Sequence, residues 1–127
     1  MAVELNHMIV ESADKVRGAA YVADILGLPA PKPFARFMVV ELDNGVSLDF
    51  MDKSGNVTPQ HYAFLVEDSD FDAMFERIKA SGAAWWADPG RTKPHEINHR
   101  YGGRGVYFDH PDGHLLEILT TPYGSAT

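Results

Sequence analysis

The stretch GVYFDHPDGHLLEIL, residues 105–119, contains the most informative pattern in the chain. Two apolar runs flank Pro111-Asp112-Gly113, a combination typical of a tight turn, and together they predict a β-hairpin. Glu117 is unusual because its carboxylate falls in the middle of an apolar strand. If Gly113 is the left-handed residue of a three-residue turn, Tyr107 pairs with Glu117. We therefore expect Tyr107 and Glu117 on one face of the hairpin.

The order of elements that leads to this hairpin occurs twice in the chain. Each half is expected to run strand, helix and then a small antiparallel sheet, because apolar periodicity and turn residues alternate in the same order. The elements expected in the first half are a strand over 4–12, a helix capped by Ser12 or Asp14 and ending at Gly27, a weak edge strand over 29–35, and a hairpin around 43–45. Those expected in the second half are a strand over 60–68, a helix over 68–82, a strand over 83–88 and the hairpin of 105–119.

The repeat extends to individual side chains in the last strand of each half. Asp49 follows Gly45 by four residues, and Glu117 follows Gly113 by four residues as well. A carboxylate therefore occupies the same slot after the same kind of turn in both halves.

Each half also carries a histidine near the beginning of its first strand, His7 in NHMIVE and His61 in QHYAFLVE. Together with the repeated carboxylates, this predicts a single domain of two βαβββ modules, about 1–57 and 58–127, related by a pseudo-twofold axis.

Side-chain alternation along the strands brings these groups to one face of each sheet. Large apolar residues take the helix side, which leaves His7, His61 and Glu117 on the opposite, concave side with Tyr107. Imidazole nitrogen and carboxylate oxygen, with no sulfur, suit a divalent ion such as Zn, Mn, Fe, Ni or Co. The charge of such an ion would also explain why a carboxylate is tolerated between leucines.

Structural roles are the alternative for each of these residues. A buried histidine is often a hydrogen-bonded core residue, and Glu117 can instead pair with Arg36 or Arg104. A half-exposed strand would place Asp49 or Glu117 in solvent. The repetition of the same residue types in the same two slots favours the metal site. The histidines that flank the turn and those of the polar loop 87–104 are expected to be structural or on the surface: His110, His114, His95 and His99.

Composition narrows the class of protein. The 127 residues carry a formal net charge of −7, which argues against a surface that follows nucleic-acid phosphates. There is no cysteine, so disulfides, thiolate ligands and cysteine nucleophiles are excluded. No apolar run is long enough for a membrane span, and the N-terminal stretch has no signal-peptide pattern. We expect a cytoplasmic protein.

The sequence resembles the vicinal oxygen chelate superfamily, which includes glyoxalase I, the bleomycin-binding proteins, fosfomycin-resistance thiol transferases and extradiol dioxygenases. Four segments carry the resemblance: LNHMIV (5–10), ILGL (25–28), QHYAFLVED (60–68) and GVYFDHPDGHLLEI (105–118). The resemblance implies an α+β fold in which two βαβββ modules form a cupped open barrel, completed across a homodimer.

The resemblance also implies roles for particular residues. His7, His61 and Glu117 fall on the family's three general metal-ligand positions. Asp49 falls where glyoxalase I has a glutamate that serves as fourth ligand and base, and Asp is one methylene shorter. Tyr107 matches an active-site tyrosine of the fosfomycin enzymes. We therefore predict Asp49 and Tyr107 as catalytic residues.

The function expected from these residues is that of a metal-dependent, glyoxalase-like lyase or isomerase. The metal would act as a Lewis acid on a small oxygenated substrate, with Asp49 or Glu117 as the base, and Arg104, Arg100 or Lys93 would neutralise an anionic tail. One alternative is an extradiol-type dioxygenase that uses Fe(II) held by two histidines and a carboxylate. Another alternative is a non-enzymatic protein that binds a drug and confers resistance.

Overall fold

The computed structural model describes residues 2–124 of the chain. Contacts between Cα atoms separate the chain into two compact units, Met1–Thr58 and Pro59–Thr127. Each unit contains a four-stranded sheet of its own and one α-helix, so each is described by itself.

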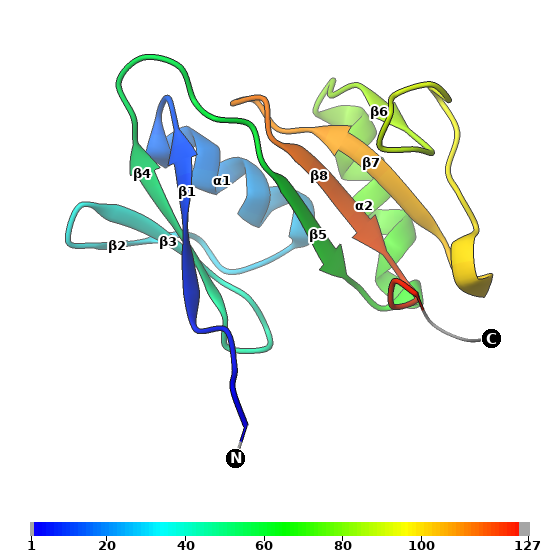
Figure 1. The fold of residues 1–127 in the computed structure, drawn as a ribbon, viewed down its shortest axis with the longest axis horizontal. Coiled ribbons are helices and arrows are strands. Elements are labelled where there is room, and N and C mark those ends of the chain that lie inside the picture. The colour runs from blue at the N-terminus through cyan, green and yellow to red at the C-terminus, as the bar shows by residue number, and fades with distance from the viewer. Residues whose placement is uncertain (1, 125–127) are drawn as a thin grey trace. The chain divides into compact units, whose positions relative to one another are not determined.

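The first unit runs β1, α1, β2, β3, β4 along the chain. Its sheet has the order β1-β4-β3-β2, with β1 parallel to β4 and the other neighbours antiparallel (Figure 1). The bounds are β1 His7–Ser12, α1 Lys15–Leu26, β2 Lys32–Phe34, β3 Phe37–Glu41 and β4 Ser47–Asp52.

The second unit repeats this topology. Its sheet has the order β5-β8-β7-β6, again with the first strand parallel to the last and the remaining neighbours antiparallel. The bounds are β5 His61–Leu65, α2 Asp68–Ala80, β6 Trp85–Trp86, a 3-10 turn η1 Arg100–Gly102, β7 Gly105–Asp109 and β8 Leu115–Leu119. The predicted α+β class, built from two βαβββ repeats, is confirmed.

Local sequence signals explain the ends of α1. The Asp14 carboxylate accepts hydrogen bonds from the backbone N–H groups of Val16 and Arg17, at 3.1 and 3.2 Å, and so satisfies two donors of the first turn. Gly27 ends the helix with φ of 66°, a left-handed conformation that glycine adopts without strain. Of the two caps considered from the sequence, Asp14 is the one used.

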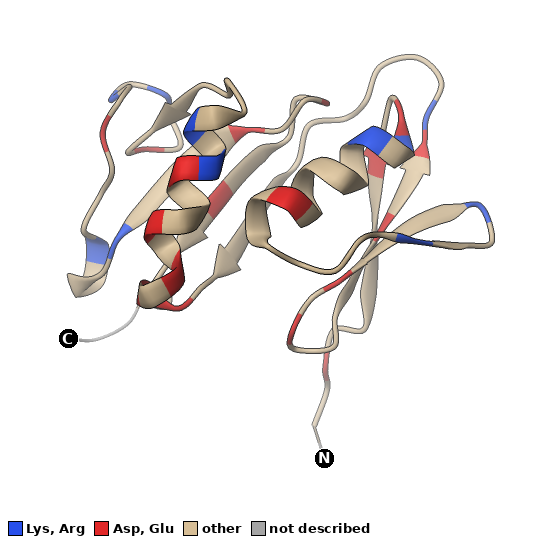
Figure 2. Cartoon of the chain, turned by 180° about the vertical axis from the view of Figure 1, so that it is seen from behind, with Lys and Arg blue, Asp and Glu red and all other residues tan. Residues whose placement is uncertain are grey.

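Each helix covers one face of its own sheet, as Figure 2 shows from behind. In the first strand of each unit the residues on the helix side are buried or half-buried, and the alternate residues are more exposed. On β5, Tyr62 and Phe64 are half-buried, whereas His61, Ala63 and Leu65 are exposed. The faces predicted from strand alternation are therefore confirmed.

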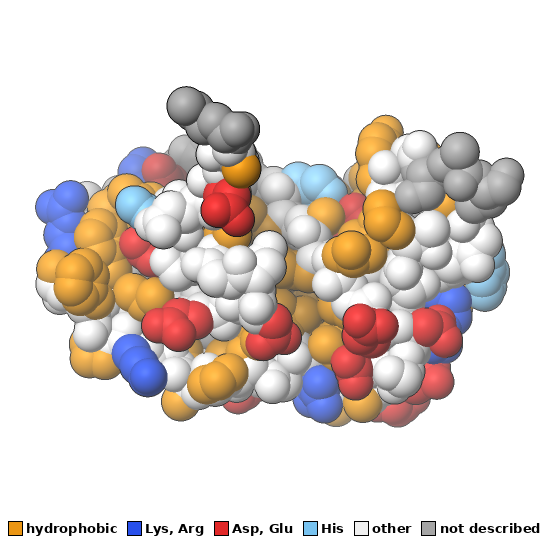
Figure 3. Space-filling model, turned by 90° about the horizontal axis from the view of Figure 1, so that it is seen from below, with side chains coloured by type: hydrophobic (Ala, Val, Ile, Leu, Met, Phe, Trp, Pro, Cys, Tyr) orange, Lys and Arg blue, Asp and Glu red, His pale blue; other side chains and the backbone are white. Residues whose placement is uncertain are grey.

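Acidic side chains lie among exposed hydrophobic ones on the face drawn in Figure 3.

Among the described residues, no helix combines the length and the hydrophobicity that a membrane span requires.

Candidate metal site

His61 and Glu117 meet on the exposed face of the second unit's sheet. Strands β5 and β8 are parallel, and Ala63 is the register partner of Glu117. His61 precedes Ala63 by two residues and shares its face, and its Nε2 lies 3.1 Å from Glu117 Oε1. The methyl group of Ala63 is small enough to let the two longer side chains meet. Glu117 is only 7% exposed, so it is a buried carboxylate, as the hairpin sequence suggested.

The orientation of the His61 ring is fixed by the backbone. Its Nδ1 lies 2.9 Å from the carbonyl oxygen of Leu115, which can only accept a hydrogen bond, so Nδ1 must carry a proton. In the neutral ring, Nε2 then presents a lone pair to the Glu117 carboxylate. Two acceptors at 3.1 Å attract each other only if a proton or a cation lies between them. A backbone bond to Nδ1 is also the usual support of a metal-binding histidine.

Tyr107 completes this cluster from β7. It is the register partner of Glu117 and hydrogen-bonds to that carboxylate, and its ring stacks on His61 with centroids 5.8 Å apart. Burial raises the pKa of the Tyr107 phenol, and the nearby negative charge of Glu117 raises it further. Tyr107 is thus a neutral hydrogen-bond donor at physiological pH. The predicted pairing of Tyr107 with Glu117 is confirmed.

Arg100 approaches the same tyrosine from the polar loop. Its Nη1 donates to the Tyr107 hydroxyl at 3.0 Å, and its guanidinium lies 5.7 Å from the centre of the ring. The charge and hydrogen bond of Arg100 oppose the rise in the Tyr107 pKa. A chain of polar contacts therefore leads from Arg100 through Tyr107 and Glu117 to His61.

A shallow cleft adjoins this chain of contacts within the second unit, and its enclosed space of about 10 Å³ is room for about one water molecule. Its lining includes Glu117, Arg100, Arg104, and the two aromatic rings of Tyr101 and Tyr123. The sequence indicated that the loop 87–104 would border a site, and this cleft shows which part of the loop does so.

The equivalent residues of the first unit have the same register. Ile9, two residues after His7, is the partner of Asp49 in the parallel β1–β4 pair. His7 also has its Nδ1 near an oxygen, the side-chain Oδ1 of Asn6 at 2.7 Å. However, Asp49 accepts a hydrogen bond from the Ser47 hydroxyl at 2.9 Å, and no contact between His7 and Asp49 is found among the described residues.

Three substitutions between the repeats account for this difference. Asp49 is one methylene shorter than Glu117, and bulky Ile9 stands where the second unit has Ala63. Ser47 also supplies a local hydroxyl, whereas its counterpart Leu115 has none. The structure thus unites His61, Glu117 and Tyr107, and it leaves His7 and Asp49 on the other unit.

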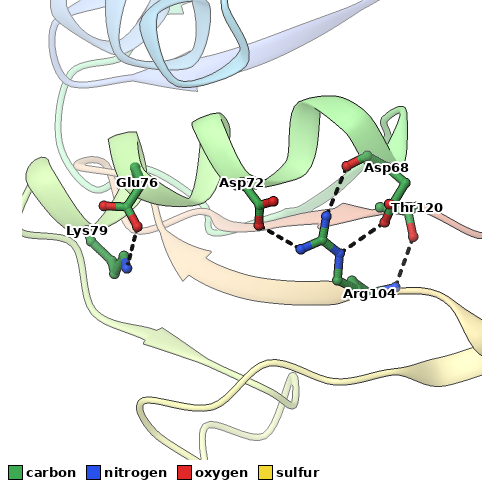
Figure 4. Close-up of polar contacts among 6 residues, drawn as sticks. All are labelled: Asp68, Asp72, Glu76, Lys79, Arg104 and Thr120. Carbon is green, nitrogen blue, oxygen red and sulfur yellow. Dashed lines mark hydrogen bonds and ion pairs between the residues drawn. The ribbon is translucent and has the colours of Figure 1, made fainter.

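Arg104 is not a partner of Glu117, contrary to one of the structural alternatives. It forms ion pairs with Asp68 Oδ1 at 3.0 Å and Asp72 Oδ1 at 2.7 Å on α2 (Figure 4). Its guanidinium lies 4.4 Å from the ring centre of Phe71. The hydrogen bond to Asp72 is the main cause that raises the pKa of Arg104. Because these carboxylates hold Arg104, it is not available to neutralise a substrate.

The remaining histidines of the second half have structural contacts. Buried His114 accepts a hydrogen bond at Nδ1 from the Gln60 backbone, and buried His110 accepts one from the Asp112 backbone. The His95 ring lies 5.5 Å from that of Trp85. These three agree with the structural roles expected of them.

Within residues 2–124, no group of three or more histidine or carboxylate side chains is close enough to hold a metal. His61 and Glu117 would supply two ligands to a metal ion, so a third protein ligand would have to come from outside this pair. The sequence analysis did not single out two residues that shape the site. Ala63 matters because it is small, and Asn98 matters because it hydrogen-bonds to the backbone of Arg100 and Gly105. The one signal that could have identified Ala63 is its small size at the position that pairs with Glu117.

Comparison with known proteins shows which protein family the chain resembles. A sequence profile of the Glyoxalase/Bleomycin resistance protein/Dioxygenase superfamily matches residues 6–118. Two solved structures are similar along their whole length. Oxidase ChaP-H1 is 64% identical with a TM-score of 0.95, covering 98% of this chain and 100% of its own. Oxidase ChaP-H2 is 55% identical with a TM-score of 0.96, covering 100% of both chains.

Curated relatives are more distant. Glutathione transferase FosA of Serratia marcescens is 27% identical over 124 residues, which cover 93% of this chain and 81% of that protein. Metallothiol transferase FosB of Shouchella clausii is 42% identical over 60 residues only, which cover 47% of this chain and 37% of that protein.

Proposed function

Because the chain belongs to the Glyoxalase/Bleomycin resistance protein/Dioxygenase superfamily, we propose that it is a metal-dependent oxidase acting on a small oxygenated substrate. The observation that carries this proposal is the 64% identity to Oxidase ChaP-H1 over 98% of the chain. Of the chemistries considered from the sequence, this favours O₂-dependent oxidation over proton transfer alone. The glyoxalase-like proton transfer stays a prediction.

The proposed metal ligands are His61, Glu117 and His7. A set of two histidines and one carboxylate with open positions is typical of non-haem Fe(II) sites, so Fe(II) is the ion we propose. We further propose that His7 is supplied by a second copy of the chain, in a cytoplasmic homodimer.

The geometry of the second unit is compatible with this ligand set. Two ligands bound about 2.1 Å from one ion at a right angle lie about 3 Å apart. The separation of His61 Nε2 from Glu117 Oε1 is 3.1 Å, and the proton on Nδ1 leaves Nε2 free to donate its lone pair. This separation is therefore compatible with the two side chains binding one divalent ion.

Bound Fe(II) would supply O₂ activation and a Lewis acid for the substrate oxygens. The protein residues have separate tasks. The hydrogen bond from Tyr107 holds Glu117 in place. When a substrate binds, the neutral Tyr107 phenol can donate its hydrogen bond to a substrate oxygen instead of to Glu117. We propose Asp49 as an acid/base group, because its Ser47 hydrogen bond engages one carboxylate oxygen and leaves the other able to take up a proton.

The metal assignment is tested without a known substrate. Metal-stripped protein is titrated anaerobically with Fe(II), and nitric oxide is added as an O₂ analogue that gives a characteristic electron paramagnetic resonance signal on ferrous sites. We expect one Fe(II) per chain and a signal that His61→Ala, Glu117→Gln and His7→Ala each abolish. The matched control is His99→Ala, an exposed histidine of the polar loop, which should retain the signal.

The oxidase assignment is tested with an oxygen electrode. The Fe(II) protein is offered aromatic compounds with two neighbouring oxygens, and O₂ uptake above that of Glu117→Gln is expected for at least one. Solvent-deuterium incorporation into an α-hydroxyketone without O₂ uptake would instead establish the proton-transfer activity. Fe(II) binding that survives in the His61 and Glu117 variants would refute the ligand set itself.

A further inference from the structure

We propose that Arg100 forms an anchoring site for a carboxylate attached to an aromatic ring, next to the His61–Glu117 pair. This names the substrate class of the proposed oxidase and therefore rests on that function. The relevant cleft is the shallow one lined by Arg100, Tyr101, Glu117 and Tyr123.

Arg100 has hydrogen-bonding capacity to spare. Within residues 2–124 its guanidinium makes one hydrogen bond, from Nη1 to the Tyr107 hydroxyl, although a guanidinium carries five N–H donors. No ion pair involves Arg100 among residues 2–124. The other arginine of the cleft, Arg104, is occupied by Asp68 and Asp72. Arg100 is therefore the cation at this cleft that remains able to bind an anion.

The position of Arg100 is fixed before any ligand arrives. Asn98 forms two backbone hydrogen bonds with Gly105, both 2.9 Å, and its side-chain oxygen accepts from the Arg100 backbone N–H at 3.3 Å. Tyr101 has φ of 55°, a left-handed conformation that costs a non-glycine residue free energy. Backbone held in this way keeps the guanidinium on Tyr107 and lowers the entropic cost of binding.

The chemistry of the site favours a planar carboxylate on an aromatic ring. The two parallel N–H groups of a guanidinium match the two oxygens of a carboxylate. A neutral oxygen-containing group does not form this charged, two-point contact. Tyr101 and Tyr123 form an edge-on pair with centroids 6.0 Å apart, and they supply aromatic surface beside the charge. The enclosed space of about 10 Å³ takes one water-sized group, so a carboxylate oxygen would enter the cleft and the ring would lie outside it, against Tyr101 and Tyr123.

The overall charge of the protein makes this site selective. With a net charge of −7, the molecule repels anions at long range, so an anion binds only where a local cation and hydrogen bonds outweigh that repulsion. An anchored carboxylate at Arg100 places the rest of the substrate toward Glu117, which lines the same cleft.

The test uses benzoate as the probe and benzamide as its neutral counterpart. Both are titrated into metal-free, full-length protein, and binding is followed by ¹H–¹⁵N NMR of the Arg100, Tyr101 and Gly102 amides. Metal-free protein is used so that benzoate cannot bind through an ion. We expect saturable benzoate binding at these amides and at least tenfold weaker binding of benzamide.

Two variants complete the test. Arg100→Gln should weaken benzoate binding at least tenfold, because it removes the charge and the fork. The matched control is Arg91→Gln on the same loop, since Arg91 is paired with Asp109 at 2.9 Å and stacks on Trp86; benzoate affinity should stay unchanged. Equal affinity for benzamide, or unchanged benzoate affinity in Arg100→Gln, would overturn the proposal. Either result is independent of Fe(II) binding and O₂ uptake, so failure of the oxidase assignment is distinguished from failure of the anchor.

Discussion

Ala63 is the register partner of Glu117 across the parallel strands β5 and β8, and its methyl group leaves the space in which the carboxylate reaches His61. The first unit has Ile9 at this position, opposite Asp49, and there the histidine and carboxylate remain apart. The size of this residue is thus one of the differences between the two repeats that bear on the proposed metal site.

Enlarging Ala63 should therefore weaken metal binding. In Ala63→Ile, the longer side chain occupies the space between His61 and Glu117, and we expect the affinity for Fe(II) or Mn(II) to fall at least tenfold. Isothermal titration calorimetry measures the affinity. Leu65→Ile, on the same exposed face of β5, is the control and should bind as the wild type does. Wild-type affinity in Ala63→Ile would contradict the proposed ligand geometry.

Glu117 should cost stability when no metal is bound. Burying a carboxylate is unfavourable, so metal-free Glu117→Gln is expected to be as stable as the wild type or more stable by about 1 kcal/mol. Added metal should raise the melting temperature of the wild type and leave that of Glu117→Gln unchanged. Urea unfolding of the metal-free proteins measures the first effect, and thermal unfolding with and without metal measures the second. A large loss of stability in the metal-free variant would mean that Glu117 is a structural residue.

Tyr107 should make stability fall at high pH. Its pKa is raised in the folded protein above the value of about 10 for an unfolded chain, so the folded state holds the proton more tightly. The resulting stabilisation is complete below pH 10 and is lost as the pH rises through the folded-state pKa. The difference in unfolding free energy between the wild type and Tyr107→Phe should therefore shrink above pH 10. Urea unfolding at pH 8 and pH 10.5 measures it, and a constant difference would contradict the raised pKa.

The ion pairs between Arg104 and α2 should contribute only modestly to the free energy of unfolding. Its partners Asp68 and Asp72 are largely exposed, so a double-mutant cycle of Arg104→Gln with Asp72→Asn should give a coupling of about 0.2–1 kcal/mol. The coupling should weaken in 1 M NaCl, which screens exposed charges. The Glu76–Lys79 pair within α2 is a matched control, because it joins no second element. A salt-independent coupling would indicate that packing on Phe71 dominates.

Much of each unit could be predicted from the sequence because its signals are local. The Asp14 cap, the Gly27 terminus and the Pro111-Asp112-Gly113 turn depend on neighbouring residues, and hydrophobic alternation assigns strand faces residue by residue. The pairing of Tyr107 with Glu117 followed from turn length alone.

Other predictions stay open because they depend on how the units and a second copy come together. His7 and Asp49 belong to the first unit, and their metal-binding and catalytic roles remain predictions, as do the identity of the metal and the homodimer.

The sequence by itself determined the repeat, the strand faces and the candidate carboxylate, since these depend on spacing along the chain. Only the tertiary structure decided that Arg104 turns to α2 while Arg100 reaches Tyr107, because a loop residue's partner depends on where the chain returns in space. It also decided that His61 presents Nε2 to Glu117. The reason is that the Leu115 carbonyl, on the neighbouring strand β8 but far away in the sequence, fixes the proton on Nδ1.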